Sequence, residues 1–325
     1  MRVMLYGSPV EYLREGLNAR LGDVSFVEAQ YTDSDEIFAE GLEGCSAIVS
    51  VRIDRPSLLP ASVKLVQVPG IGTDEINVGS LPNWVTLCNV GEHGPAVAEY
   101  VIGTLLARTM GLCATDRAFR AGSWQASSRM GGSPHGELFG TRVGIVGFGS
   151  IGREISIRLK PFGVQTNVCN RSEVAVSGQI DCFWPISQLT EMAANCDILI
   201  VTVALTPETE GLVGRDVLGA LPQGSVLVNV ARGPIVEEDA LYDVMKAGHL
   251  SGAILDVWWR YPETAADTEM RPSRHDFTRF PGVIVTPHIS GWSSGTVFRR
   301  LDVIADNLKS IFEGRAPTNV VRVGL

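Results

Sequence analysis

Short apolar runs alternate with amphipathic segments along the first hundred residues. Between the first two runs, apolar residues recur every three or four positions from Val10 to Leu21, which predicts one buried helix face. This order of strands and helices predicts an α/β unit with a parallel sheet. Five runs have the length and composition of buried strands: residues 3–6, 24–27, 47–51, 65–68 and 85–88.

A second series of strands follows a long helical segment. Pro95 precedes small and apolar residues over 96–110, which predict a helix able to bridge two domains. Gly and Ser dominate 121–137, which predicts a surface loop, and 297–311 predicts a last amphipathic helix. Six apolar runs predict a second parallel sheet: residues 143–146, 164–169, 198–203, 226–230, 253–257 and 283–286.

A glycine motif opens this second unit. Residues 143–152 read VGIVGFGSIG, so three glycines lie between a predicted strand and a predicted helix. Gly147 permits the tight turn, Gly149 lets the backbone approach the phosphates, and Gly152 lets the helix pack against the strand. The free N–H groups at the start of that helix favour an anion. The motif therefore predicts dinucleotide binding.

The end of the next strand bears on the choice of nucleotide. An acidic residue about 20 positions after the glycines normally accepts hydrogen bonds from the ribose of NAD. Asn170 occupies this place, carries no charge to repel a 2′-phosphate, and is followed by Arg171, which can pair with one. In the alternative, Asn170 bonds the NAD ribose and Arg171 faces solvent. The sequence favours NADP over NAD.

Composition limits the classes of partner. The chain has 325 residues, enough for two domains, with a net charge of −9 and a pI near 5.1, which argue against nucleic acid or an anionic membrane. No apolar run reaches the roughly 18 residues of a membrane span, and the N-terminus reads as a strand rather than a signal peptide. Six cysteines without CxxC spacing indicate reduced thiols in a cytoplasmic protein, and five separated histidines form no metal cluster.

Polar residues and a glycine turn follow the carboxyl ends of several predicted strands. In open parallel sheets ligands bind at this edge. Arg232, Asp256 and His288 each follow a strand of the second unit, and the turn 69–72 follows a strand of the first. Each has an ordinary structural explanation on its own. Their shared placement predicts a cation, an acid, a histidine and an exposed turn near the nicotinamide.

Several segments resemble the D-isomer-specific 2-hydroxyacid dehydrogenase family. NVARGPIVEEDAL, AILDVW, TPHISG, PGIGTDEI and AVAEY carry the likeness, which extends from about residue 65 to residue 305. The resemblance implies an α/β fold in which a Rossmann cofactor domain, 101–289, is inserted in a flavodoxin-like substrate domain of parallel sheet, 1–100 and 290–325. It also implies a homodimer formed through the cofactor domains, and hydride transfer between NAD(P) and a small 2-hydroxy or 2-oxo acid.

The resemblance assigns roles to individual residues. Arg232 resembles the arginine that binds the substrate carboxylate and polarises the carbonyl, and His288 resembles the general acid–base. The backbone of Ile71 and Gly72 resembles the N–H pair that holds the carboxylate, and Asp256 resembles the group that orients the nicotinamide amide. The expected catalytic residues are Arg232, His288 and Tyr261, and the expected substrate-binding residues are Ile71, Gly72, His93 and Ser290. The expected cofactor-binding residues are Gly147, Gly149, Ser150, Ile151, Gly152, Asn170, Arg171, Ser172, Val203, Ala231, Asp256 and Gly291.

Tyr261 departs from the family pattern. The family has a Glu directly before the Pro that follows the LDV segment, where it contacts the histidine and raises its pKa, whereas LDVWWRYP has Tyr261. A neutral phenol can orient His288 through a hydrogen bond but supplies no charge. We therefore expect His288 to titrate lower than in Glu-bearing relatives, so that reduction declines at a lower pH. Glu263 is the other candidate for the missing carboxylate.

His93 is a second departure, because the family often has Asn at this position, four before the VAE segment. It is either a loop residue at a helix start or an extra donor for a second anionic group of the substrate. Residues 264–279 form an insertion that either shapes the pocket or is a solvated loop. Its cationic residues are Arg271, Arg274, His275 and Arg279.

Several functions stay open on the sequence. The leading one is an NADP(H)-dependent 2-oxoacid reductase. The DVWW and PHISG context also resembles NAD-dependent formate dehydrogenases, and a phosphonate- or phosphite-oxidising relative, or a substrate with a second carboxylate, is a further alternative. Loss of the Glu fits a non-catalytic dinucleotide sensor or corepressor, but the retained Arg232, Asp256 and His288 favour catalysis.

Overall fold

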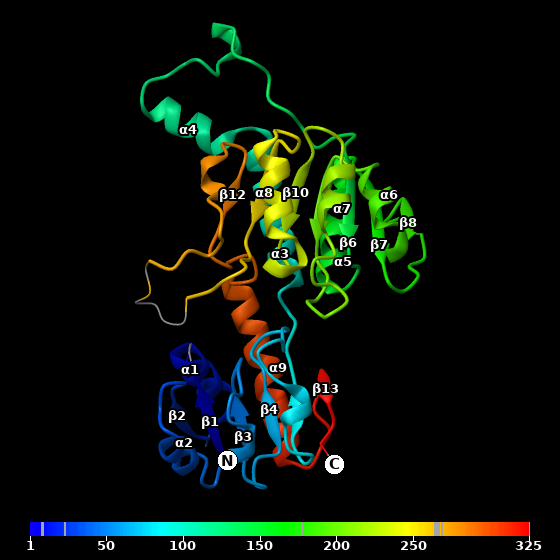
Figure 1. The fold of residues 1–325 in the computed structure, drawn as a ribbon. Coiled ribbons are helices and arrows are strands. Elements are labelled where there is room, and N and C mark those ends of the chain that lie inside the picture. Colours follow the sequence, from blue (N-terminus) through cyan, green and yellow to red (C-terminus); the bar gives the residue numbers. More distant parts are fainter. Residues whose placement is uncertain (8–9, 23, 177, 263–266, 268, 325) are drawn as a thin grey trace. The chain divides into compact units, whose positions relative to one another are not determined.

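Two units make up the chain, and the second is inserted within the first in sequence (Figure 1). The computed structural model describes residues 1–7, 10–22, 24–176, 178–262, 267 and 269–324. The first unit comprises Met1–Glu92 with Ser294–Leu325, and the second comprises His93–Ser293. The sequence places the boundaries at 100/101 and 289/290, whereas the contacts assign all of helix α3 (Gly94–Thr109) to the second unit.

The first unit is built on a six-stranded sheet of order β13-β5-β4-β3-β1-β2. Strands β1 to β5 pair in parallel, as the alternating pattern predicts, and β13 adds an antiparallel edge. Strand β13 has only three residues, and two of them are exposed, so its sequence is too short and too weakly patterned to predict a strand. The strands are Arg2–Tyr6 (β1), Ser25–Ala29 (β2), Ala47–Val49 (β3), Leu65–Gln67 (β4), Thr86–Cys88 (β5) and Val320–Arg322 (β13).

Helices from both ends of the chain cover this sheet. On one face, α1 (Val10–Leu21) and α9 (Ser294–Phe312) share a core in which Leu17 and Ile304 are fully buried. On the other, α2 (Asp35–Gly41) buries Phe38. Each such buried side chain stabilises the fold by about 1.5–3 kcal/mol. The first unit is therefore stabilised by contacts between the two ends of the chain, which also meet in the Arg20–Asp302 ion pair of α1 and α9, 282 positions apart.

The second unit contains a seven-stranded parallel sheet of order β12-β11-β10-β9-β6-β7-β8. The chain runs outward from β6 to β8 and then returns to the other side of β6, so the strand order reverses between β6 and β9, where such sheets bind ligands. Strand β8, which the sequence did not predict, is a half-exposed edge. The strands are Arg142–Val146 (β6), Gln165–Asn170 (β7), Cys182–Pro185 (β8), Ile198–Val201 (β9), Val226–Asn229 (β10), Gly252–Leu255 (β11) and Ile284–Val285 (β12).

Helices cover both faces of the second sheet (Figure 1). On one side, α3 packs with α5 (Ser150–Leu159), and Val101 and Ile155 are fully buried there. On the other side lie α6 (Leu189–Ala193), α7 (Arg215–Ala220) and α8 (Glu238–Lys246). The central strands β9, β10 and β11 are buried throughout, which explains their continuous apolar runs. Short 3-10 turns span Pro56–Leu58, Val78–Ser80, Ser128–Met130, Lys160–Phe162, Ile186–Gln188, Gly233–Ile235 and Phe277–Arg279.

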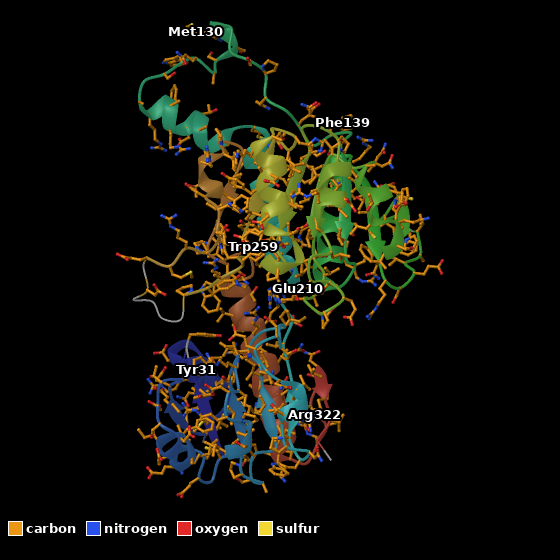
Figure 2. All side chains as sticks on the ribbon, in the orientation of Figure 1. Tyr31, Met130, Phe139, Glu210, Trp259 and Arg322 are labelled. Carbon is orange, nitrogen blue, oxygen red and sulfur yellow. The ribbon has the colours of Figure 1, made fainter. Side chains whose placement is uncertain are left out.

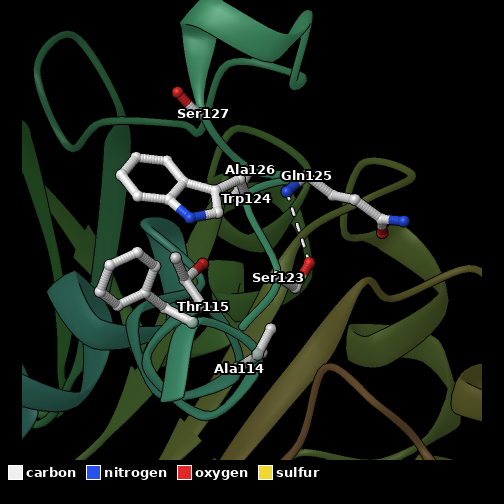
Figure 3. A pocket seen from close by; sticks show the side chains of 9 residues that line it. Ala114, Thr115, Ser123, Trp124, Gln125, Ala126 and Ser127 are labelled. Carbon is white, nitrogen blue, oxygen red and sulfur yellow. Dashed lines mark hydrogen bonds between the residues drawn. The ribbon is translucent and has the colours of Figure 1, made fainter. Parts of the chain in front are cut away.

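An arm, residues 111–137, leaves the second unit between α3 and β6. It begins with α4 (Leu112–Arg120), and none of its residues is buried. Met130 lies at its far end, and Phe139 lies where the chain returns to the sheet (Figure 2). The rings of Phe119 and Trp124 meet edge to face at 5.2 Å and line a cavity of about 460 Å³ (Figure 3). The cavity has no titratable lining residue and lies within the arm itself.

Among the residues that the structure describes, no single helix is long and apolar enough for a span. Helices α3 and α4 reach the length and apolar composition of a span only when they are taken together, and the pair is bent by 57°.

Candidate active site

The three glycines after β6 have different surroundings. Gly147 has a φ of +95°, and a Cβ there would lie 2.7 Å from Val203 Cγ1. A Cβ on Gly152 would lie 2.3 Å from the carbonyl oxygen of Gly147, so the start of α5 can approach the strand only with glycine at this position. A Cβ on Gly149 would meet nothing within 4 Å. Gly149 therefore leaves open space at the N-terminus of α5, which begins with Ser150 and Ile151, and this space fits a pyrophosphate.

The glycine turn is tied to its neighbours by a residue that the sequence analysis missed. Thr202, directly after β9, has its hydroxyl 2.8 Å from the carbonyl oxygen of Gly147 and 3.0 Å from that of Val146. The next residue, Val203, packs over the turn. A hydroxyl residue immediately after a buried strand at the point of order reversal is the sequence signal that would have indicated this contact.

The amide of Asn170 connects the end of β7 to the same turn. Its Oδ1 accepts a bond from the backbone N–H of Phe148 at 3.4 Å, and its Nδ2 donates to the carbonyl of Ser172 at 2.9 Å. Arg171 is exposed beside it, and the guanidinium of Arg153 lies 4.8 Å from the centre of the Phe148 ring. This corner of the unit therefore presents two arginines and a neutral amide.

Arg232, Asp256 and His288 come directly after or soon after three adjacent strands, β10, β11 and β12. Neighbouring strands lie about 4.8 Å apart, so these residues share the carboxyl edge of the sheet. The glycine turn, residues 170–172 and Val203 lie at or after the ends of β6, β7 and β9, at the same edge. The structure thus brings these strand-end residues to one edge of the second sheet.

The turn that carries Arg232 is held by an amide. Asn229 is fully buried, its Oδ1 accepts from the N–H of Ala231 at 3.1 Å, and its Nδ2 donates to the carbonyl of Arg232 at 2.9 Å. A Cβ on Gly233 would lie 2.3 Å from the backbone of Trp258, so only glycine allows this approach. Nη1 of Arg232 donates to the carbonyl of Ala231 at 2.8 Å, so the guanidinium is also tied to its own turn.

Asp256 organises the turn that contains His288. Its carboxylate is fully buried, and Oδ1 accepts from the Thr286 hydroxyl at 2.6 Å and from the N–H of Ile289 at 2.8 Å. Oδ2 accepts from the N–H of Ser290 at 2.8 Å, and the Asp256 carbonyl accepts from the N–H of His288 at 2.8 Å. His288 has a φ of +59°, a left-handed backbone conformation that few non-glycine residues adopt.

Tyr261 lies next to His288, and its catalytic role stays a prediction. The ring centres are 5.6 Å apart and the rings are tilted by 48°. The phenol oxygen of Tyr261 accepts a bond from the N–H of Trp258 at 3.1 Å, which fixes the orientation of the tyrosine. Glu263, the alternative candidate, lies outside the described residues.

His93 lies against the turn that contains His288. It directly precedes α3 and is only 7% exposed, and a Cβ added to Gly291 would lie 3.3 Å from the Cβ of His93. Its ring therefore packs against the segment that follows His288, although the two histidines are far apart in sequence.

Ile71 and Gly72 belong to the first unit, in the turn after β4. The carbonyl of Gly70 accepts from the N–H of Val90 at 2.9 Å, and that of Ile71 accepts from Nδ2 of Asn89 at 2.9 Å. In the described parts of the chain, the N–H groups of Ile71 and Gly72 donate to no protein acceptor. Their expected role as donors to a substrate carboxylate stays a prediction.

The described end of the insertion is anchored to α8. The buried carboxylate of Glu238 accepts from the Ser273 hydroxyl at 2.7 Å, from the N–H of Arg274, and from Nε of Arg274 at 2.9 Å. The ring of His275 stacks on that of Tyr242 with 4.1 Å between centres. Residues 273–275 are thus held by α8 rather than solvated on all sides.

The comparisons with known proteins identify the family. A family model described as "D-isomer specific 2-hydroxyacid dehydrogenase, NAD binding domain" matches residues 102–290, more than half of the chain. The chain belongs to this family. A glycerate dehydrogenase from Methylorubrum extorquens is 27% identical, over 95% of this chain and 96% of that protein. A hydroxyphenylpyruvate reductase from Plectranthus scutellarioides is 34% identical over 222 residues, 67% of this chain and 65% of the relative.

A solved structure extends the likeness over nearly the whole chain. The NADPH-dependent glyoxylate/hydroxypyruvate reductase from Sinorhizobium meliloti, in complex with NADP and malonate, has a TM-score of 0.81 and 29% identity, covering 98% of this chain and 96% of that one. The D-3-phosphoglycerate dehydrogenase of Mycobacterium tuberculosis is longer, and the match, at 29% identity, spans 56% of it. As a 2-hydroxyacid dehydrogenase, the chain is an oxidoreductase that binds a nicotinamide cofactor and interconverts 2-hydroxy and 2-oxo acids by hydride transfer to or from that cofactor.

Proposed function

We propose that this 2-hydroxyacid dehydrogenase works as an NADP(H)-dependent reductase of a small 2-oxo acid. The observation that carries the proposal is the placement of Arg232, Asp256 and His288 after three adjacent strands, at the edge that also holds the glycine turn. A binding protein that only senses the cofactor needs the glycine turn but has no use for an arginine and a histidine fixed beside it.

Each residue has a defined task in this reaction. When bound, the reduced nicotinamide supplies a hydride to the carbonyl carbon of the substrate. Arg232 binds the substrate carboxylate and stabilises the negative charge that develops on the carbonyl oxygen. His288 donates a proton from its imidazolium to that oxygen, which completes the alcohol. Asp256 holds the His288 turn and supplies a carboxylate acceptor toward the nicotinamide amide.

The preference for NADP rests on the corner after β7. Asn170 has both ends of its amide engaged within the turn and brings no negative charge, and Arg171 is exposed next to it. A 2′-phosphate bonded to Arg171 accounts for this arrangement. Arg171→Ala should raise KM for NADPH by about tenfold, the loss of one charge-assisted bond, with KM for NADH unchanged. Arg14→Ala, an exposed arginine of the first unit, is the matched control.

Initial rates test the reaction directly. NADPH and NADH are compared with glyoxylate, hydroxypyruvate, pyruvate and bulkier 2-oxo acids, and turnover with preference for NADPH is expected. His288→Asn should abolish turnover without disturbing the fold, because Asn tolerates the left-handed backbone of this position. Tight cofactor binding without turnover across the panel would instead favour the sensor function.

The arm supports a homodimer. Leu112, Phe119, Trp124 and Met130 are each more than half exposed, and apolar side chains gathered on one projecting segment favour contact with another protein surface. The arm carries three arginines and two acidic residues, whereas the whole chain has a net charge of −9. This charge difference suits a second copy as the occupant. Sedimentation of a Phe119→Ser, Trp124→Ser double variant should give a monomer where the unaltered protein gives a dimer, and an unchanged mass would exclude this interface.

A further inference from the structure

Two hydroxyl groups extend the contacts of Asp256 into helix α3. The phenol oxygen of Tyr100 lies 2.6 Å from Oγ1 of Thr286, which lies 2.6 Å from Oδ1 of Asp256. Tyr100 and Thr286 are 186 positions apart in the sequence, and the two hydroxyls are partly buried. No task in the proposed reaction involves either group, so their short contacts call for another explanation.

The chemistry of the three groups sets the direction of these hydrogen bonds. A carboxylate can only accept, so the single hydroxyl proton of Thr286 goes to Asp256. Oγ1 of Thr286 must then accept from Tyr100, which is the donor at the start of the chain. Burial raises the pKa of Tyr100 to about 12, against a smaller opposite effect of the Thr286 bond, so the phenol keeps its proton across the neutral range.

The relay from Tyr100 through Thr286 ends on the Asp256 carboxylate, which holds the His288 turn. Oδ1 of Asp256 also accepts from the N–H of Ile289, and Oδ2 accepts from that of Ser290. Within the described residues Asp256 forms no ion pair, so hydroxyl and amide donors alone fix the orientation of its carboxylate. The Thr286 hydroxyl is the one side-chain donor among them, and Tyr100 fixes that hydroxyl.

We propose that Tyr100 and Thr286 are positioning residues for His288, which act by holding the Asp256 carboxylate in the orientation that keeps the His288 turn in its left-handed conformation. The proposal rests on the acid–base role proposed for His288. It assigns a task to a side chain of α3 that lies outside the strand-end motifs.

Amide hydrogen exchange of residues 288–290 tests the relay without any substrate. In the full chain, Tyr100→Phe and Thr286→Val should each speed exchange of these amides by about threefold to tenfold, the effect of one hydrogen bond, while Thr286→Ser should keep their protection. Tyr6→Phe is the matched control, because its hydroxyl donates to Asp54 at 2.7 Å in the first unit and its loss leaves the turn unaffected. Unchanged exchange in both Tyr100→Phe and Thr286→Val would overturn the proposal.

Kinetics test the link to His288. Tyr100→Phe should lower kcat for reduction by about threefold to tenfold with KM for the 2-oxo acid nearly unchanged, and Thr286→Ser should retain the activity that Thr286→Val loses. A rise in KM alone would contradict a positioning role. Faster exchange with an unchanged kcat would overturn the positioning role of Tyr100, whereas turnover by His288→Asn would overturn the acid–base role of His288, so the two failures are distinguishable.

Discussion

Two buried carboxylates in the second unit each hold a loop, and they do so with different donors. Asp256 holds the His288 turn through the Thr286 hydroxyl and two backbone N–H groups, all of them neutral. Glu238 holds the described end of the insertion through a serine hydroxyl, a backbone N–H and the guanidinium of Arg274. One carboxylate is thus held by dipoles and the other is also neutralised by a cation.

The difference fits two separate tasks. Glu238 is a structural clamp for the insertion, whereas Asp256 belongs to the proposed active site. The Glu238–Arg274 pair cancels its own charge at the surface of α8, which suits a contact that only has to be stable. Asp256 keeps its negative charge at the carboxyl edge of the sheet, where the cofactor is expected. Neutral donors can therefore fix a carboxylate without removing the charge that the site uses.

Removing Asp256 should have the largest effect. Asp256→Ala leaves a hydroxyl and two amides without their acceptor, which should lower the free energy of unfolding by about 2–4 kcal/mol. Displacement of His288 by about 1 Å should lower kcat about 100-fold. Denaturant titration and initial rates measure both. Asp243→Ala removes an exposed carboxylate paired with Arg215 and is the control. Near-normal kcat in folded Asp256→Ala would contradict this account of the turn.

Removing Glu238 should affect stability and leave catalysis almost unchanged. Glu238→Ala should lower the free energy of unfolding by about 1–3 kcal/mol, because Ser273 and Arg274 lose a shared acceptor, although Arg274 can turn to water. The kcat at saturating substrate should stay close to that of the unaltered protein. A loss of kcat as large as that of Asp256→Ala would remove the distinction between the two carboxylates and make the insertion part of the site.

Acid should weaken the Glu238 clamp. Burial raises the pKa of Glu238, but the hydrogen bonds from Ser273 and Arg274 outweigh burial and the net pKa is lowered. A carboxyl whose pKa is depressed by folding stabilises the protein above its unfolded pKa of about 4.3, and this stability is lost as pH falls through the folded pKa. The difference in unfolding free energy between the unaltered protein and Glu238→Gln should therefore shrink below about pH 4.3. A pH-independent difference would show that ionisation of Glu238 contributes nothing.

Adding a carboxylate beside His288 should have the smallest effect at neutral pH. In Tyr261→Glu, the new charge favours the imidazolium, so the upper limb of the pH profile for reduction should move by about one unit toward higher pH. Tyr261→Phe keeps the ring next to His288 and separates the loss of the hydroxyl from the gain of charge. Identical profiles for the unaltered protein and Tyr261→Glu would refute the view that the missing Glu lowers the pKa of His288.

The parts of this protein that could be predicted are those governed by local pattern. Continuous apolar runs predict the central strands, because both faces of those strands are buried, and the position of Arg232 or His288 just after such a run predicts its edge. Strand β8 has partly exposed residues on an edge, so its pattern is weak. The relay from Tyr100 to Thr286 joins residues 186 positions apart and depends on side-chain packing, which a single sequence does not reveal.

The return of the chain to the first unit has a consequence for synthesis on the ribosome. The second unit is continuous in sequence and can fold as soon as it has emerged, whereas the first sheet waits for α9, which is made after residue 293. Until then Leu65 of β4 and Leu17 of α1 lack the α9 side chains that complete their shared core. The nascent chain therefore exposes the apolar surface that α9 later covers through most of its elongation. A chaperone can act on this surface, and premature termination would leave an aggregation-prone product.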